Sequence, residues 1–202
     1  MKKLIIIPVL ILLLFPGCRS TQPVQNNFFL LELPSAFFED SERRVKSLDA
    51  TCELKKVEVA APYASHQIAI REDSHRMRYF TFNEWAHRPG QSFSNMALRY
   101  LEEGKFFREL FTGRQRETPD YLIETKVFHL EVDNRTGMFE ARLVVEFQMI
   151  NTASNEPVVL HPANKSRFLQ DNGLNLFAAA TSDLFYDELS NFMELVIINF
   201  DD

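Results

Sequence analysis

The sequence has little glycine, proline or tryptophan and almost no cysteine. Its 202 residues include 6 Gly, 9 Pro, 1 Trp and 2 Cys. So few Gly and Pro exclude a collagen-like or Gly/Ser-rich chain, and a hydrophobic fraction of 46% excludes a disordered one. A long basic run is also lacking and the formal net charge is -6, so nucleic acid is not an expected partner. We therefore expect one compact domain.

The N-terminal residues have the order of a secretory signal peptide. A basic start, Met1-Lys2-Lys3, precedes an apolar run over residues 4–15. This run has 12 residues, whereas a membrane-spanning helix needs about 20, so a membrane span is the less favoured alternative. Residues 1–17 are therefore predicted to be a signal peptide that the mature protein lacks.

The end of the apolar run resembles the lipobox of bacterial lipoproteins. Leu14-Phe15-Pro16-Gly17-Cys18 places a small residue directly before a cysteine, although Phe15 and Pro16 are bulky for this motif. The resemblance implies that Cys18 is acylated, with palmitate among its chains, and that cleavage precedes it. Two or three acyl chains on one cysteine give stable membrane anchoring. Arg19 at the next position, where an Asp is associated with inner-membrane retention, implies the outer membrane and its periplasmic face.

Residues 18–27 are predicted to be the lipidated cysteine and a flexible tether, and residues 28–202 the folded domain. The tether segment 19–27 is polar and aperiodic, and nine extended residues reach about 30 Å. With Cys18 acylated, Cys52 has no partner for an intramolecular disulfide. Cys52 is interpreted as a buried side chain at the start of a strand, and a reactive thiol is the alternative.

Short apolar runs predict strands in the first half of the domain, at residues 28–33, 54–61, 67–70, 77–82 and 106–111. The charged segment 35–51 is predicted to be a surface excursion in which Phe37 and Phe38 need cover. Between Ser92, a candidate N-cap, and Gly104, apolar residues recur with the period of a helix.

The second half predicts a hairpin, a third strand and a long helix. Residues 121–132 and 138–149 flank a turn over residues 133–137, whose Asn and Gly accept positive φ. Residues 158–160 extend the hairpin to a three-stranded meander, and residues 174–196 have helical periodicity. The order predicts an α+β fold: a single domain with a mostly antiparallel or mixed sheet and two amphipathic helices packed on it.

Motifs for catalysis or cofactor binding are missing. Five histidines are scattered without metal-ligand spacing, and no nucleophile elbow or phosphate loop is present, so we expect no metal, no cofactor and no enzymatic activity. Asp187 and Glu188 are interpreted as part of a solvated helix face. The 19 Phe are interpreted as core residues, and a lipid-lined cavity is the alternative.

Residues 76–89, Arg-Met-Arg-Tyr-Phe-Thr-Phe-Asn-Glu-Trp-Ala-His-Arg-Pro, resemble the auxiliary lipoproteins of ABC-type transport systems. In that family a strand containing a Tyr, an aromatic and a Trp-Ala pair leads through a Pro-containing turn into a helix. Segments at residues 28–34, 57–63, 67–71 and 120–124 fit the same family in order, and the long charged segment 35–51 departs from it.

This resemblance implies a non-enzymatic, periplasm-facing lipoprotein that takes part in moving lipids between two membranes. The implied partners are an MCE-domain protein, an ABC permease and its ATPase, with phospholipid and further copies of the chain as additional candidates. Tyr79, Phe82 and Trp85 are the implied partner-binding residues, but for Trp85 packing of the first helix on the sheet is the favoured role and anchoring of a partner is the alternative. The alternative function is a lipoprotein that activates a periplasmic cell-wall enzyme.

Overall fold

The computed structural model describes residues 25–35, 37, 47–113 and 118–201, so the predicted signal peptide, Cys18 and most of the tether lie outside it. Its elements, in chain order, are β1 (Asn27–Phe29), β2 (Leu48–Leu54), β3 (Glu58–Val59), the 3-10 helix η1 (Ala61–Tyr63), β4 (Gln67–Arg71), β5 (Met77–Trp85), α3 (Pro89–Gly104), β6 (Phe107–Thr112), β7 (Tyr121–Asp133), β8 (Glu140–Asn151), β9 (Glu156–Phe168) and α4 (Leu174–Asp201). Two helices pack on a curled mixed sheet, which confirms the predicted α+β single domain.

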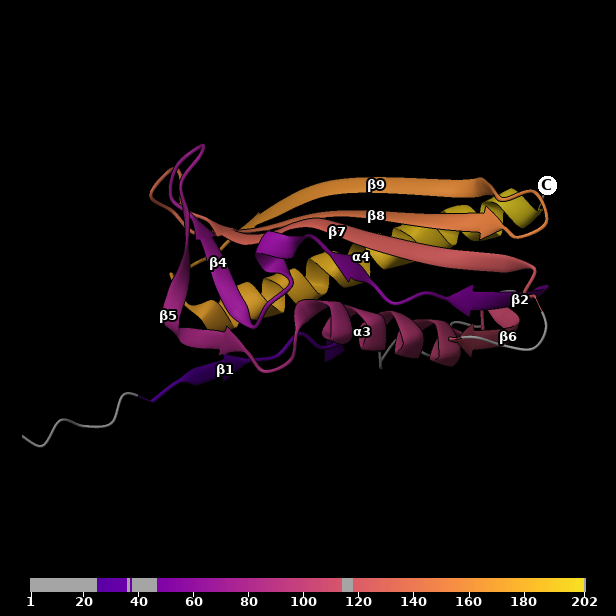
Figure 1. The fold of residues 1–202 in the computed structure, drawn as a ribbon, viewed down its shortest axis with the longest axis horizontal. Helices are drawn as coiled ribbons and strands as arrows, with labels where there is room; N and C mark the ends of the chain where they lie inside the picture. The colour runs from indigo at the N-terminus through magenta and orange to yellow at the C-terminus, as the bar shows by residue number, and fades with distance from the viewer. Residues whose placement is uncertain (1–24, 36, 38–46, 114–117, 202) are drawn as a thin grey trace, which may run out of the picture.

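The sheet is built around the long strand β7 (Figure 1). One edge of β7 pairs antiparallel with β8 from Tyr121 to Asp133. The other edge is shared by β2, β3 and β4, which pair with it in parallel, one after another. Beyond these strands, β6 pairs with β2, β5 with β4, and β1 with β5.

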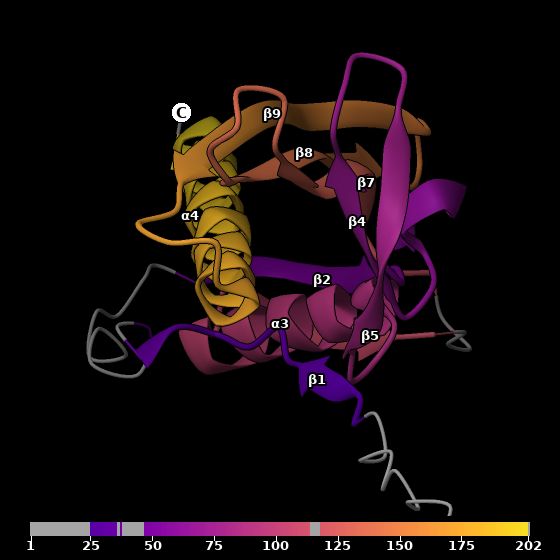
Figure 2. The same cartoon turned by 90° about the vertical axis from the view of Figure 1, so that its left-hand side faces the viewer.

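The predicted meander β7-β8-β9 is confirmed, and it carries one wall of the core. In β8 the five residues on one face are at most 1% exposed; they are Ala141, Leu143, Val145, Phe147 and Met149. Helix α4 lies along this face (Figure 2), and its Phe185 and Phe192 rings are each 5.5 Å from the Phe147 ring. The alternation of buried and partly exposed residues along β8 therefore reflects the packing of one face of the strand against α4.

Helix α3 begins four residues earlier than predicted. Pro89 occupies its first turn, and Arg88 is the N-cap residue without a side-chain cap. Proline suits this position because its φ is preset for a helix and its missing N–H would have no partner there. Ser92, the predicted N-cap, is a buried helical residue instead. The Phe93 ring stacks on Phe185 of α4 at 4.4 Å, which brings the two helices together.

The predicted strand over residues 54–61 is broken. The Val57 N–H donates to Ser94 Oγ on α3 at 2.9 Å instead of continuing the ladder with β7. A Cβ at Gly90 would lie 3.0 Å from the Val57 carbonyl oxygen, so a larger residue there would push the helix and this backbone apart by a few tenths of an ångström. The break between β2 and β3 is therefore where α3 is seated.

The predicted buried strand at residues 28–33 is short and largely exposed. Only Asn27–Phe29 pair, in parallel with the end of β5, and Phe28 and Leu30 are 62% and 47% exposed. Of the predicted excursion over residues 35–51, residues 36 and 38–46 lie outside the described part. Phe37 is buried against Tyr100 and Tyr186, and β2 already begins at Leu48.

A paired substitution in β8 tests which face the core covers. Val145 is 1% exposed and faces α4, whereas its neighbour Val144 is partly exposed on the opposite face. Val145→Asp should lower the free energy of unfolding by several kcal/mol, because a carboxylate would be buried without a partner. A typical domain's whole free energy of unfolding is about 5–15 kcal/mol, so this loss would be a large part of it. Val144→Asp should cost much less. Equal melting temperatures of the two variants would contradict the assignment.

Candidate interaction surface

Trp85 lies in the core. It is 2% exposed, its ring is 5.6 Å from Phe177 of α4, and its backbone pairs with Phe29 of β1. The backbone N–H of Trp85 donates to the His66 carbonyl oxygen at 2.7 Å. The side chain therefore joins the end of β5 to α4, whereas the packing role expected from the sequence was to hold the first helix, α3, on the sheet.

The other two residues singled out on β5 have different surroundings. Phe82 is 46% exposed, so its ring is available to a partner. Tyr79 is partly buried, and its hydroxyl donates to the Pro62 carbonyl oxygen at 2.9 Å, which ties β5 to η1. Binding of a partner by these residues remains a prediction, and Phe82 is the one with accessible apolar surface.

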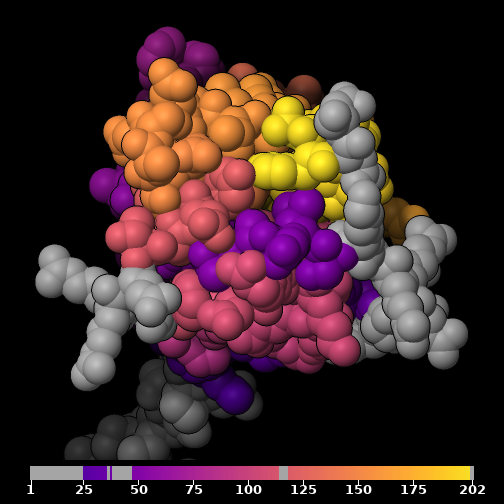
Figure 3. All heavy atoms as spheres, turned by 90° about the vertical axis from the view of Figure 1, so that its right-hand side faces the viewer, coloured from indigo at the N-terminus to yellow at the C-terminus, as the bar shows by residue number. Residues whose placement is uncertain are grey.

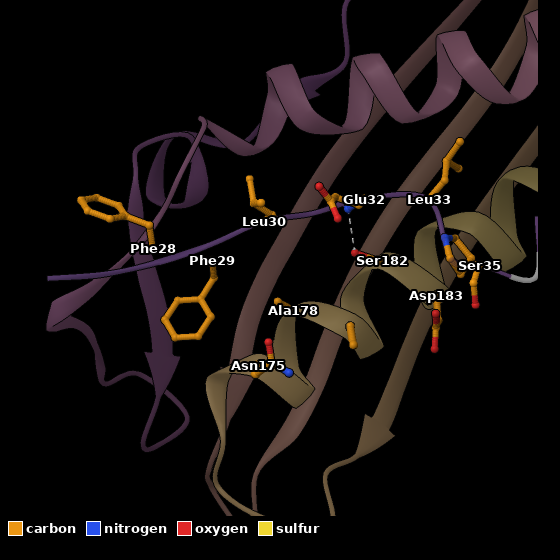
Figure 4. A pocket seen from close by; sticks show the side chains of 12 residues that line it. Phe28, Phe29, Leu30, Glu32, Leu33, Ser35, Asn175, Ala178, Ser182 and Asp183 are labelled. Atoms are coloured by element: carbon orange, nitrogen blue, oxygen red, sulfur yellow. Dashed lines mark hydrogen bonds between the residues drawn. The ribbon is translucent and has the colours of Figure 1, made fainter.

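A groove separates the N-terminal segment from the first turns of α4 (Figure 4). Its volume is about 530 Å³, within the range of small-molecule sites. It is lined by Phe28, Phe29, Leu30, Glu32, Leu33, Pro34, Ser35, Asn175, Ala178, Ala179, Ser182 and Asp183. The groove is open because the side chains of α4 that face it are small. The Glu32 backbone N–H donates to Ser182 Oγ at 3.2 Å, and this hydrogen bond holds the extended segment across the groove.

A second polar feature is the buried carboxylate of Glu131 on β7. Arg71 on β4 holds it with two hydrogen bonds, Nε to Oε1 at 2.7 Å and Nη2 to Oε2 at 2.9 Å. The Tyr63 hydroxyl donates to Oε2 at 2.7 Å, and Arg142 Nη1 donates to Oε1 at 3.3 Å. The cluster thus joins η1, β4, β7 and β8 on the face of the sheet away from α4.

The protonation states follow from these contacts. Burial by itself raises the pKa of Glu131, but the hydrogen bonds from Arg71 and Tyr63 outweigh it and hold the pKa below its ordinary value. Burial and Glu131 raise the pKa of Tyr63 to about 12. Burial, and then the charge of Arg142, lower the pKa of the neighbouring His129. The carboxylate is charged and fully partnered, which indicates a structural clamp.

Helix α4 is less solvated than the sequence suggested. Glu188 is only 4% exposed, and its carboxylate contacts His161 Nε2 at 2.9 Å and Lys165 Nζ at 3.2 Å on β9. Asp187 and Asp183 pair with Arg167 at 3.2 Å and 2.6 Å. The interpretation of a solvated face was therefore wrong for Glu188, because β9 curls over this side of α4. The sequence signal for this contact was the spacing of His161, Lys165 and Arg167, which places all three on one face of β9.

The remaining candidates for chemistry are metal-ligand clusters and the Cys52 thiol. Within the described residues, no group of three His, Cys, Asp or Glu side chains could hold a metal ion. The Cys52 thiol is buried, and burial raises its pKa, so it is an unreactive core side chain. In the same part of the chain, no helix is long and apolar enough to cross a membrane.

A family model described as "ABC-type transport auxiliary lipoprotein component" matches residues 37–191. No curated protein matches significantly. The crystal structure of protein XCC0632 from Xanthomonas campestris has a TM-score of 0.69 and 12% identity, over 88% of this chain and 95% of that one. An uncharacterized protein has a TM-score of 0.63 and 12% identity, over 85% and 99%. At these identities, the solved structures share the fold alone.

The clamp predicts a pH dependence of stability. Because the pKa of Glu131 in the folded protein lies below its ordinary value of 4.5, its stabilisation is present above that pH and is lost as the pH falls through the folded pKa. The lowered pKa of His129 acts in the same direction, starting below 6.5. Glu131→Gln should cost about 3–5 kcal/mol near pH 7, because Arg71 loses its buried partner, and should flatten the acid limb of the unfolding curve.

The matched control is Glu124→Gln, also on β7, whose side chain is 33% exposed and whose carboxylate lies 4.0 Å from Lys126 Nζ. Chemical denaturation of both variants between pH 3 and 8 measures the effect. Indistinguishable pH profiles would show that the clamp does not contribute to stability.

Proposed function

Because the chain belongs to the family of ABC-type transport auxiliary lipoprotein components, we propose that it is a lipid-anchored, non-enzymatic subunit of an ABC transport system that moves lipids through the Gram-negative cell envelope. The family match over residues 37–191 carries this proposal, since it spans β2 to β9, α3 and most of α4. In the proposal Cys18 is the anchor, and the domain faces the periplasm from the outer membrane.

The shape of the molecule supports an anchored domain. The chain enters the fold at β1, at one end of the domain, and α4 ends at the opposite end (Figure 1). Nine tether residues reach about 30 Å, so an acylated Cys18 would keep the β1 end close to the membrane and leave the far end free. Figure 3 shows that far end, where α4, the β8–β9 turn and β2 lie together.

The proposed partners extend the family assignment. They are an MCE-domain protein, an ABC permease and its ATPase, in a system similar to that of paraquat-inducible protein C, with phospholipid as cargo. Further copies of the chain are also proposed as partners. The far end offers apolar contact area for a protein partner, since Leu195 and Ile198 on α4 are 42% and 61% exposed.

Acylation is tested by comparing the two cysteines. Cys18→Ala should abolish the incorporation of radiolabelled palmitate, because its thiol is the proposed site of acylation. The control is Cys52→Ala, which removes the other cysteine, buried in the core, and should keep the label. Equal label on wild type and Cys18→Ala would refute the anchor. If the wild type co-fractionates with inner-membrane markers in a sucrose gradient, this result would contradict the outer-membrane location.

Capture of partners tests the transport role. The full-length protein with a C-terminal tag, cross-linked in cells and purified from solubilised membranes, should bring down an MCE-domain protein and ABC subunits, identified by mass spectrometry. Cys18→Ala, which would lack the acyl chains and stay an uncleaved or misrouted precursor, is the control and should recover less of them. Recovery of a cell-wall synthase in their place would overturn the proposal in favour of an activator of a periplasmic enzyme.

A further inference from the structure

Large apolar side chains gather where the chain enters the fold. Phe28 and Leu30 are 62% and 47% exposed and form part of the rim of the groove (Figure 4). Phe82 is 46% exposed and directly precedes the β5 residues that pair with β1, where Asn83 lies opposite Asn27. We call Phe28, Leu30 and Phe82 the entry patch. Exposed Phe and Leu gathered in this way are a mark of an interaction surface.

The core does not account for the entry patch. Phe29 and Leu31 alternate with Phe28 and Leu30 and turn toward the core, where Leu31 is 5% exposed. The N-terminal segment is thus already secured by one set of side chains, and the other set projects outward. In Figure 4 Phe28 and Leu30 lie on one side of the segment and Phe29 on the other.

The position of the patch along the chain specifies what it meets. Phe28 follows Cys18 by 28 − 18 = 10 residues, a span of at most about 35 Å when fully extended. An acyl anchor at Cys18 therefore keeps a bilayer within reach of the patch at all times. For a tethered surface this contact is intramolecular, so a modest apolar gain is enough to favour it.

The charges around the patch specify the kind of membrane contact. Glu32 follows Leu30 on the same side of the segment, and Glu84 pairs opposite Phe28. Asp183 on the far wall of the groove is already paired with Arg167. Acidic neighbours do not favour anionic headgroups, so contact would come from the aromatic and aliphatic side chains in the interface of a zwitterionic bilayer.

We propose that the entry patch docks on the bilayer that holds the anchor, with Phe28 and Leu30 inserted at the boundary between headgroups and acyl chains. The inference rests on the proposed anchor at Cys18. It assigns Phe82 to the membrane, whereas the sequence resemblance assigned it to a protein partner. In the docked orientation the groove opens at the membrane surface, where its apolar wall meets lipid.

The test uses the full-length, acylated protein in phosphatidylcholine vesicles whose acyl chains are brominated near the glycerol. Tryptophan fluorescence is quenched by bromine at short range, and the only native Trp, Trp85, is present in every sample and is subtracted with the wild-type signal. Phe28→Trp and Leu30→Trp should each lose about half of the added emission, as for an interfacial indole. Ala153→Trp, at the exposed β8–β9 turn of the far end, is the control and should lose almost none.

Flotation of the vesicles separates failure of the anchor from failure of docking. Protein that does not float has no anchor, which refutes the proposed function and this inference with it. Protein that floats while Phe28→Trp, Leu30→Trp and Ala153→Trp are equally unquenched refutes docking alone. In unbrominated vesicles, a blue shift of the added emission that grows with protein concentration would assign the patch to contact with a second copy. A blue shift that appears only with a co-purified partner would assign the patch to that protein. Either result overturns the proposal.

Discussion

Every part of this fold depends on the need to pair both edges of β7. A strand of 13 residues in the middle of a domain has backbone donors and acceptors along two edges, and leaving them buried without partners would be costly. On one edge β8 pairs with it over its whole length. No single strand does so on the other, where β2, β3 and β4 follow one another in parallel. The interruptions between these short strands hold the seat of α3 and the turn η1.

The faces of β7 are set by a bulge at Phe128. Before it, Ile123, Thr125 and Val127 face the core; after it, Leu130 and Val132 do. One extra residue in a strand exchanges the faces of all that follow. Without the bulge, Glu131 would point at α4, among apolar side chains. With it, Glu131 meets Arg71, Tyr63 and Arg142 on the opposite face. The bulge also leaves Phe128 itself 44% exposed.

The sequence predicted those elements whose periodicity is strong and whose partners are local. The meander and α4 follow from alternation in β8 and from helical spacing after Leu174. The break at Val57 could not be predicted, because it depends on Ser94, which is 37 residues away. Burial of Glu188 depends in the same way on β9 curling over α4. The bulge did leave a local signal, because the apolar residues Val127 and Leu130 are three positions apart instead of two. The prediction of one regular strand over residues 121–132 overlooked this spacing.

The N-terminal segment follows a different rule from the rest of the molecule. Elsewhere large apolar side chains are mostly buried by the sheet and its two helices, whereas β1 is a three-residue strand on the outer edge of β5. Phe29, Leu31 and Leu33 pack against the core there, so replacing Phe28 or Leu30 with polar residues would remove little from the core. A soluble domain gains nothing from exposing these two side chains to water. For a domain held by an acyl anchor, as we propose for Cys18, the nearest apolar phase would be the membrane that holds the anchor, and the two side chains would leave water there.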